Sequence, residues 1–428
     1  MSKEIIEKAK YCLNCRTKPC TLGCPLENNI PEFINEIKNE NYEQAYHILS
    51  RTTVLQPICG LICPHMSQCQ GNCVRRFKGE PTSIGELEAF IGKKALENKY
   101  SFSEDKIEKN NKKVAVIGGG PSGLTCAAFL ARKGYSVTIY EKHNELGGIL
   151  SHGIPEFRLD RNILKKTIDK IISLGINVQY KKEIEIDVTL KELKKNYDAI
   201  FLGFGANIST KMNIEGEELK GVFGGNELLE NKTHPNYKDK KVAVIGGGNV
   251  AIDCARTIKK LGAKEVYIIY RRAEEQMPAE KKEIEEAKKE NIKFLFQNNI
   301  IKILGNEGKA NKIECIKTEL IKKEGELRLS PIDIKGSNYK LDIDYVVMAI
   351  GSKTQENIVN KLGVKLNNRG YIEVDEKYMT SINGVFAGGD LIGQKATVAW
   401  AARAGRKAAD AIDAILGTGF LIADLKFT

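Results

Sequence analysis

The nonapeptide KKVAVIGGG occurs twice in this chain of 428 residues, at Lys112–Gly120 and again at Lys240–Gly248. In each copy an apolar run typical of a buried strand leads into a glycine turn. A helical pattern and a second strand-like segment follow, SGLTCAAFLARKG with SVTIYEK in the first copy and NVAIDCARTIKKLG with EVYIIYRR in the second. Strand, glycine turn, helix and strand form the β-α-β unit of dinucleotide-binding domains. The repeat therefore predicts two such domains of the α/β class.

Later segments predict how the two modules are connected. Residues 197–207 (YDAIFLGFGAN) and 344–354 (DYVVMAIGSKT) are both apolar strands that end at a glycine, one for each module. After the second module come VFAGGDLIG and the helical pattern ATVAWAARAGRKAADAIDAIL, which would complete the first. We therefore expect two doubly wound domains, the second inserted into the first.

The first hundred residues differ from the rest because they show helical spacing and little strand pattern. They predict an all-α domain whose loops carry cysteines. The expected boundaries are 1–105 for the helical domain, 106–235 and 346–428 for the first nucleotide domain, and 236–345 for the second.

The composition of the two glycine turns fits phosphate binding. In the first turn Gly118 allows the tight turn, Gly120 lets the backbone approach a pyrophosphate, and Gly123 lets the helix pack on the sheet. The corresponding positions of the second turn are Gly246, Gly248 and Ala251. Phosphates would face unpaired N–H groups at the positive end of the helix dipole. A tight turn without nucleotide is the alternative.

The residues at the ends of the second strands suggest different nucleotides. Glu141 lies 18 residues after Gly123, where a carboxylate can accept hydrogen bonds from ribose hydroxyls. The second module has Arg271 and Arg272 at this point, and guanidinium groups can bind a 2′-phosphate that a carboxylate would repel. We expect an adenine dinucleotide with a free ribose, such as a resident flavin, in the first module and NADPH in the second. A solvated charged loop is the alternative for the arginines.

Eight of the eleven cysteines lie within the first 73 residues, in two groups of four. The first group is Cys12, Cys15, Cys20 and Cys24, and the second is Cys59, Cys63, Cys69 and Cys73. Two closely spaced sets of four thiols suit two [4Fe-4S] clusters, with all eight cysteines as ligands on spacing alone. Structural zinc is the main alternative, and disulfides are disfavoured in a chain that we expect to be cytoplasmic.

The charge of the chain limits its partners. The formal net charge is +11, the N-terminus MSKEIIEKAK is charged throughout, and no apolar run approaches the roughly 20 residues of a membrane span. We expect no membrane association, and no nucleic-acid binding because basic stretches are not interleaved with stacking aromatics. The charge reflects either a lysine-rich surface or a basic face for an acidic electron carrier.

The motifs together resemble a known group of flavoproteins. CxxCxxxxCxxxCP, IPEFRL, GGGPSG, GGGNVA, YRR…MP and FAGGD occur in this order over essentially the whole chain. They resemble the small (beta) subunit of NADPH-dependent glutamate synthase. They are equally similar to the large subunit of NADH-dependent ferredoxin:NADP oxidoreductase, and related to the N-terminal half of dihydropyrimidine dehydrogenase.

The resemblance implies FAD, NADPH and two [4Fe-4S] clusters, and it changes the ligand sets. One cluster would be bound by Cys12, Cys15, Cys20 and Cys73. The other would be bound by Cys24, Cys63, Cys69 and Glu88, leaving Cys59 unused.

The resemblance also implies the nucleotide contacts. Those for FAD are Gly118, Gly119, Gly120, Pro121, Ser122, Gly123, Glu141, Leu146, Gly147, Gly148, Arg158, Gly389, Asp390, Ala396, Thr397 and Val398. Those for NADPH are Gly246, Gly247, Gly248, Asn249, Val250, Ala251, Arg271, Arg272, Ala349, Ile350 and Gly351. No catalytic side chain is expected, because the cofactors supply the chemistry.

The predicted function is that of an electron-input subunit. NADPH reduces the flavin, and electrons pass singly through the clusters to a partner. That partner is a glutamate synthase large subunit, a flavin/[2Fe-2S] subunit or a pyrimidine-reducing subunit, and ferredoxin is a possible carrier. A redox sensor that binds the same cofactors without turnover is the alternative of another class. The segment ENKTHPNYKD is shorter than its counterpart in many of the similar proteins, which leaves the partner's identity open.

Overall fold

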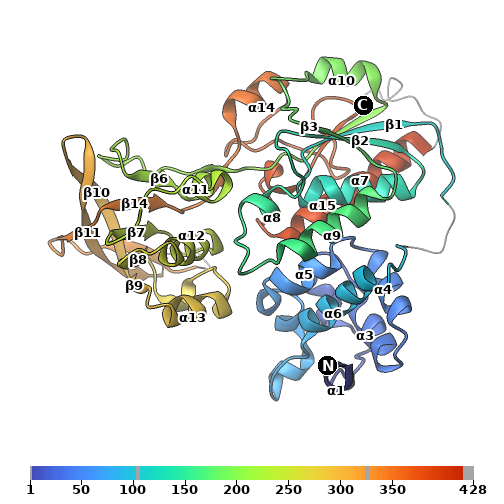
Figure 1. The fold of residues 1–428 in the computed structure, drawn as a ribbon, viewed down its shortest axis with the longest axis horizontal. Coiled ribbons are helices and arrows are strands. Elements are labelled where there is room, and N and C mark those ends of the chain that lie inside the picture. Colours follow the sequence, from blue (N-terminus) through green and yellow to red (C-terminus); the bar gives the residue numbers. More distant parts are fainter. Residues whose placement is uncertain (1, 103–106, 323–327, 418–428) are drawn as a thin grey trace. The chain divides into compact units, whose positions relative to one another are not determined.

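The computed structural model describes residues 2–102, 107–322 and 328–417 (Figure 1). The chain divides into two compact units. The first contains the described parts of 1–151, 156–206 and 354–428, and the second contains 152–155 and 207–353. Over these described ranges, no helix has both the length and the apolar character needed to cross a bilayer.

The N-terminal region is all-α, as predicted. Its helices are α1 (Ser2–Lys10), α2 (Pro19–Leu22), α3 (Ile30–Lys38), α4 (Tyr42–Ser50), α5 (Gln56–Ile62), α6 (Ile84–Glu97) and the 3₁₀ turns η1 (His65–Ser67), η2 (Gln70–Asn72) and η3 (Val74–Phe77). Helices α5 and α6 pack closely because glycines lie at their crossing. A Cβ atom on Gly60 would lie 2.3 Å from the amide nitrogen of Ala89, and one on Gly92 would lie 2.5 Å from that of Pro57.

The first parallel sheet has the strand order β16-β4-β1-β2-β3. Its strands are β1 (Lys113–Ile117), β2 (Ser136–Glu141), β3 (Asn177–Tyr180), β4 (Ala199–Leu202) and β16 (Val385–Ala387). One face packs on α10 (Leu190–Asn196) and α14 (Glu356–Leu362). Val116 points to the other face, where α7 (Pro121–Arg132) lies, with α15 (Val398–Gly417) along it (Figure 1). The short helices α8 (Ile149–His152) and η5 (Gly389–Ile392), with α9 (Arg161–Ile172), complete this part.

The second parallel sheet has the order β6-β14-β7-β8-β9. Its strands are β6 (Val222–Gly224), β7 (Lys241–Ile245), β8 (Glu265–Tyr270), β9 (Lys293–Phe296) and β14 (Tyr345–Met348). One face packs on the helices α11 (Gly225–Asn231), α12 (Asn249–Lys260) and α13 (Lys281–Lys289). The turn η4 (Glu274–Gln276) and the short pair β5 (Ile208–Ser209) and β15 (Ser352–Lys353) also belong to this unit.

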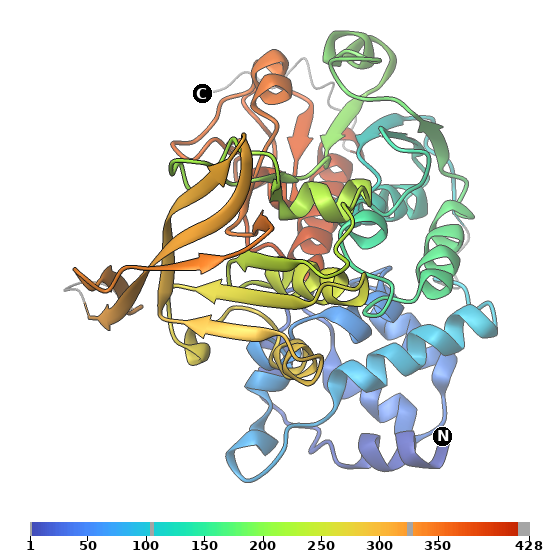
Figure 2. The ribbon, with the colours of Figure 1, turned by 60° about the vertical axis from the view of Figure 1, so that its left-hand side comes forward.

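An antiparallel sheet covers the other face of the second parallel sheet (Figure 2). It is formed by β10 (Asn298–Asn306), β11 (Lys309–Ile321), β12 (Ser330–Asp333) and β13 (Tyr339–Asp342). Ile300, Ile313 and Cys315 from this sheet pack against buried side chains of β7 and β8.

The two parallel sheets have the same order, with β16, β4, β1, β2 and β3 corresponding to β6, β14, β7, β8 and β9. Strand β16 pairs with β4 although the second unit separates them in sequence, so the predicted insertion and the fold class are confirmed. The compact units divide near residues 206 and 353, whereas the sequence pattern suggested 235 and 345. The difference arises because β6 joins the second sheet as an edge strand, so the segment that carries it belongs to the inserted unit.

Candidate functional site

The first glycine turn is closed on one side and open on the other. Gly118 has a φ of +94°, and a Cβ atom there would lie 2.7 Å from the Cα of Phe204. A Cβ atom on Gly123 would lie 1.9 Å from the carbonyl oxygen of Gly118. At Gly120, the N-cap of α7, a Cβ atom would meet its nearest neighbour, Gly148 Cα, only at 3.9 Å. The backbone is therefore accessible at the position where a pyrophosphate would lie.

Glu141 is held beside this turn. Its Oε2 accepts a hydrogen bond of 2.7 Å from the amide of Gly119, and its Oε1 accepts one of 2.9 Å from the amide of His143. The side chain is buried. Since each carboxylate oxygen can accept more than one hydrogen bond, the fixed carboxylate fits the predicted role with ribose hydroxyls.

Two other predicted flavin segments contact the same turn. The amide of Gly147 donates to the carbonyl of Gly119 at 2.8 Å, which places Leu146–Gly148 beside it. Gly389 at the start of η5 lies against Ser122, where a Cβ atom would meet Oγ at 2.9 Å. Burial raises the pKa of the neighbouring Asp390 to about 6.

The remaining flavin candidates lie in the same unit. Thr397 precedes α15, and its Oγ1 accepts a hydrogen bond of 3.3 Å from the amide of Trp400. Ala396 and Thr397 therefore lead directly into α15, which begins at Val398, and all three are among the residues that the resemblance implies for FAD. Arg158 lies between α8 and α9, and its contact with the cofactor stays a prediction.

The second glycine turn repeats this construction. Gly246 has a φ of +139°, and a Cβ atom there would lie 2.2 Å from the carbonyl oxygen of Ala349. Gly248 is the N-cap of α12 and has open space around it, while Ala251 is fully buried. Asn249 Oδ1 accepts a hydrogen bond of 2.9 Å from the amide of Glu280. Gly246–Ala251 and Ala349–Gly351 therefore lie together at the ends of β7 and β14.

The counterpart of Glu141 in the second module is Tyr270, which the sequence reasoning missed. The amide of Gly118 bonds to the carbonyl of Tyr140, and the amide of Gly246 bonds to that of Ile269, so the next residues correspond. The Tyr270 ring lies against Gly247, where a Cβ atom would meet ring carbons at 2.5 Å. Counting both strands from their glycine turns would have found this residue.

The two arginines follow Tyr270 directly. Arg271 is exposed, and the Nε of Arg272 is buried with no hydrogen-bond partner in the part of the chain that the structure describes. A buried guanidinium N–H without a partner costs free energy unless an acceptor binds there. An unsatisfied donor beside an exposed arginine therefore fits the phosphate of NADPH.

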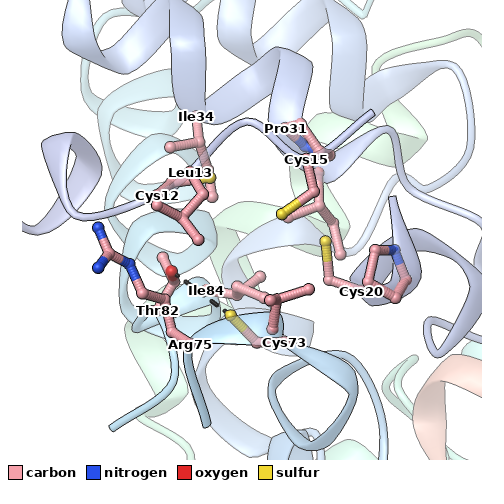
Figure 3. A pocket seen from close by; sticks show the side chains of 13 residues that line it. Cys12, Leu13, Cys15, Cys20, Pro31, Ile34, Cys73, Arg75, Thr82 and Ile84 are labelled. Carbon is pink, nitrogen blue, oxygen red and sulfur yellow. Dashed lines mark hydrogen bonds between the residues drawn. The ribbon is translucent and has the colours of Figure 1, made fainter. Parts of the chain in front are cut away.

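Four cysteines line a pocket in the helical region that is open to solvent (Figure 3). They are Cys12, Cys15, Cys20 and Cys73, the first set that the resemblance implied. Apolar side chains from α3 and α6 complete the wall, namely Ile30, Ile34 and Ile84. Burial raises the pKa of Cys20 to about 11, so a metal would have to displace the thiol proton there.

The second predicted set lies deeper. Cys24, Cys63, Cys69 and Glu88 are all buried. Burial raises the pKa of Glu88 to about 8, and the side-chain Nδ2 of Asn28 donates a hydrogen bond of 3.3 Å to Oε1. Burial and then the nearby Glu88 raise the pKa of Cys24 to about 12. The hydrogen bond with Cys59 and burial raise the pKa of Cys63, burial raises that of Cys69, and Glu88 adds to both shifts. Glu88 therefore lies among the thiols and is not a helix-surface acid.

The chemistry of these donors fits iron–sulfur clusters. All eleven cysteines are unpaired thiols. Within the described residues, no three His, Cys, Asp or Glu side chains converge on the position of a single metal ion. The four cysteines of the first set instead line a shared pocket. Cys59 is also buried and shares a hydrogen bond with Cys63, so the choice between Cys59 and Glu88 as the eighth ligand remains a prediction.

Two protein families match the chain. Residues 112–407 match the pyridine nucleotide-disulphide oxidoreductase family, and residues 1–100 match dihydropyrimidine dehydrogenase domain II, 4Fe-4S cluster. The glutamate synthase [NADPH] small chain of Escherichia coli K12 is 33% identical, over 95% of this chain and 90% of its own. The beta subunit of NADPH-Fe(3+) oxidoreductase of Geobacter sulfurreducens is 34% identical over 92% of this chain, and the beta subunit of NADP(+)-dependent formate dehydrogenase of Moorella thermoacetica 34% over 94%. The chain spans only 63% and 60% of the last two proteins.

Solved structures show the same fold. Mycobacterium tuberculosis FprA in complex with NADPH has a TM-score of 0.65 at 19% identity, over 74% of this chain and 87% of FprA. A 2-naphthoyl-CoA reductase complex has a TM-score of 0.56 at 19% identity, over 92% of this chain and 49% of its own. The chain has a thiol-rich helical region followed by two nucleotide-binding modules with the same strand order. It belongs to the pyridine nucleotide-disulphide oxidoreductase family, as an FAD-dependent NADPH oxidoreductase with an N-terminal [4Fe-4S] domain.

Proposed function

We propose that this chain is the electron-input subunit of a larger enzyme of the glutamate synthase small-subunit type. FAD binds the first module, NADPH binds the second, and two [4Fe-4S] clusters occupy the thiol sets. When bound, FAD supplies the chemistry of accepting a hydride from NADPH and releasing electrons singly to the clusters. The similarity to the E. coli small chain over nearly the full length of both proteins supports this assignment.

The difference between two otherwise equivalent turns carries the proposal. The modules share one strand order, yet Glu141 in the first corresponds to Tyr270 in the second, and Arg271 and Arg272 follow. A carboxylate favours ribose hydroxyls, and a tyrosine with two arginines favours a 2′-phosphate. One polypeptide therefore binds two different dinucleotides.

The residues around the sites bind and orient their ligands. The open backbone at Gly120 and Gly248 accepts pyrophosphates, each at the N-terminus of a helix longer than ten residues. The N-terminus of α15 at Val398 directs a positive dipole end toward the flavin, where it stabilises negative charge. No side-chain acid or base is required, since orientation accounts for the protein's share of the rate.

The surface around the first thiol set supports an acidic partner. Residues 11–23 and 73–79 together contain five lysines and arginines and no aspartate or glutamate. Cys12 and Cys15 are half-buried, whereas the other predicted ligands are buried. Leu13 and Val74, which line the pocket, are 51% and 38% exposed. Electrons therefore leave on this face, toward a partner subunit or carrier with a negatively charged rim.

An anaerobic titration with NADPH and NADH tests the proposal. NADPH should bleach the flavin absorbance rapidly, which a redox sensor without turnover would not show. The double variant Arg271→Ala/Arg272→Ala should weaken NADPH binding by at least about tenfold, because a single hydrogen bond to a charged group contributes roughly 1.5–3 kcal/mol. NADH binding should change little. Lys293→Ala, near the other end of β8, is the matched control.

Several outcomes would contradict the proposal. A colourless protein, or equal loss of NADH and NADPH binding in the double variant, would remove the assignment of the two modules. Native co-purification then identifies the partner. A large amidotransferase subunit supports the glutamate synthase type, and a small flavin/[2Fe-2S] subunit supports the ferredoxin:NADP type.

A further inference from the structure

Three cations of α15 converge on one carboxylate of the cysteine region. Glu27 accepts from Arg403 Nη1 at 2.7 Å and from Arg406 Nη2 at 2.9 Å, and Lys407 Nζ lies 3.5 Å away. Burial alone would raise the pKa of Glu27, but hydrogen bonds from Arg403 and Arg406 lower it below its ordinary value. Three positive charges and one negative charge leave this group with a net positive charge.

The same guanidinium groups bind the backbone that follows Cys24. Arg403 Nη1 donates to the carbonyl of Pro25 at 2.8 Å, and Arg406 Nη2 donates to that of Leu26 at 3.1 Å. Arg406 is only 8% exposed. Its Nη2 is paired with Glu27 and Leu26, but its Nε is buried and has no hydrogen-bond partner among the described residues, which costs free energy that a contact between a loop and a helix does not require.

The helix that carries these arginines is also fixed to the first glycine turn. Gly405, the neighbour of Arg406, lies so close to α7 that a Cβ atom would be 2.1 Å from the carbonyl oxygen of Ser122. Ser122 is part of the turn predicted to bind FAD. Successive residues of α15 therefore contact the flavin turn and the loop of a predicted cluster ligand.

We propose that Arg403 and Arg406 are positioning residues that couple the flavin site to the [4Fe-4S] cluster held in part by Cys24. They fix the loop that carries this ligand relative to the flavin module, and their charge favours the form of the cluster that holds one more electron. The inference rests on the proposed function, because it requires both cofactors in this chain. It adds residues outside both predicted ligand sets that set the equilibrium of the one-electron transfer between the cofactors.

Variants that remove a positive charge and a variant that removes a negative charge distinguish this role from a structural one. Arg403→Gln and Arg406→Gln should make the midpoint potential of this cluster more negative, which shifts the electron distribution toward the flavin by about tenfold. Glu27→Gln should make it more positive, because both arginines then lack their counter-charge. Arg406→Lys keeps the positive charge, so the midpoint potential of this cluster should stay close to that of the native protein. A purely structural contact would change the potential in the same direction in all these variants, or not at all.

The measurement is a potentiometric titration of the holoprotein followed by electron paramagnetic resonance. The cluster at Cys24 is identified as the one whose electron paramagnetic resonance signal changes in the Glu88→Cys variant. Asp413→Asn is the control, since Asp413 joins α15 to Lys133 at 2.7 Å away from the cysteine loop, and its potentials should match those of the native protein. Glu27 is 44% exposed, so Glu27→Gln is expected to fold even where an arginine variant does not.

Two results would overturn the inference. If the native protein has both clusters and the Gln variants leave the potential unchanged or move it in one direction, the coupling role fails while the proposed function stands. If the native protein lacks the second cluster, the proposed function fails and the inference fails with it.

Discussion

Glu88 shows how strongly the surroundings of one residue determine its chemistry. The residue follows Glu86 on the same helix, and both look like surface acids in sequence. Glu86 is exposed and pairs with Lys8 at 2.6 Å, whereas Glu88 is buried among cysteines and accepts a hydrogen bond from Asn28. A buried carboxyl with only a neutral partner is costly, and coordination to iron would compensate that cost.

Replacing Glu88 should therefore affect one cluster selectively. We expect Glu88→Ala to lose about half of the iron and sulfide, since each [4Fe-4S] cluster has its own four ligands. Cys59→Ala and Glu86→Ala should keep both clusters. Iron analysis and electron paramagnetic resonance of anaerobically prepared protein measure this. Loss of a cluster from Cys59→Ala, with Glu88→Ala unaffected, would assign the site to Cys59.

Asp390 predicts a pH dependence of stability in the flavin-free protein. Burial raises its pKa from the ordinary value of 3.8 to about 6, so the folded state binds this proton more tightly than the unfolded state. The Asp390 carboxyl therefore costs the folded state no stability below a pH of about 4. As the pH rises toward 6, the folded state loses stability because the buried carboxyl resists ionisation.

Asp390→Asn should remove this dependence. The flavin-free variant should be more stable than the native chain by about 3 kcal/mol at neutral pH, and equally stable near pH 4. Urea unfolding at both values measures the difference, with the exposed Asp333→Asn as the control. A variant that gains no stability at neutral pH would show that the carboxyl is solvated in the folded state.

At the scale of elements, the contact between α7 and α15 fixes the turn that is predicted to bind FAD. The contact depends on Gly405, whose missing side chain lets the two helix backbones meet at Ser122. Interiors are packed too densely to absorb a methyl group at such a distance.

Two glycines of α15 provide a matched test. Gly405→Ala should destabilise the protein by about 2–3 kcal/mol and release flavin. Gly417→Ala, in the same helix, would meet Asp413 Oδ1 at 3.8 Å as its nearest neighbour among the described residues, and it should not lower stability. Melting temperature and bound flavin per chain measure both. Equal effects of the two substitutions would contradict close packing at Gly405.

At the scale of the whole molecule, the charged residues behind the net charge of +11 are unevenly distributed. The segments around Cys12, Cys15 and Cys73 are basic without any acidic residue, and they flank the most accessible predicted cluster ligands. Charge there accelerates encounters with an acidic partner, and salt screens the effect because the Debye length falls as ionic strength rises.

Electron transfer to an acidic acceptor such as ferredoxin should therefore depend on salt. We expect the rate to fall about tenfold between low and high ionic strength. Arg16→Glu with Lys78→Glu should produce a similar loss at low salt, whereas the exposed Lys335→Glu in the other unit should not. Reduction of a small neutral acceptor is the reference reaction. A salt-independent rate, or equal losses from all three substitutions, would exclude this face as the docking surface.

The sequence alone determined the architecture, because a strand, glycine turn and helix are encoded by neighbouring residues and the repeat was identical. It also predicted thiols as the metal ligands, since two dense groups of cysteines are typical of iron–sulfur clusters. The resemblance added the mixed ligand sets, which spacing did not suggest.

Only the tertiary structure decided what depends on residues far apart in the chain. Helix packing brings Cys73 to the pocket of Cys12, Cys15 and Cys20, and it buries Glu88 among the other thiols. Strand register shows that Tyr270 corresponds to Glu141, and strand pairing assigns β6 to the second unit. These features could not be derived locally because burial and pairing are properties of the assembled core, which no short stretch of sequence contains.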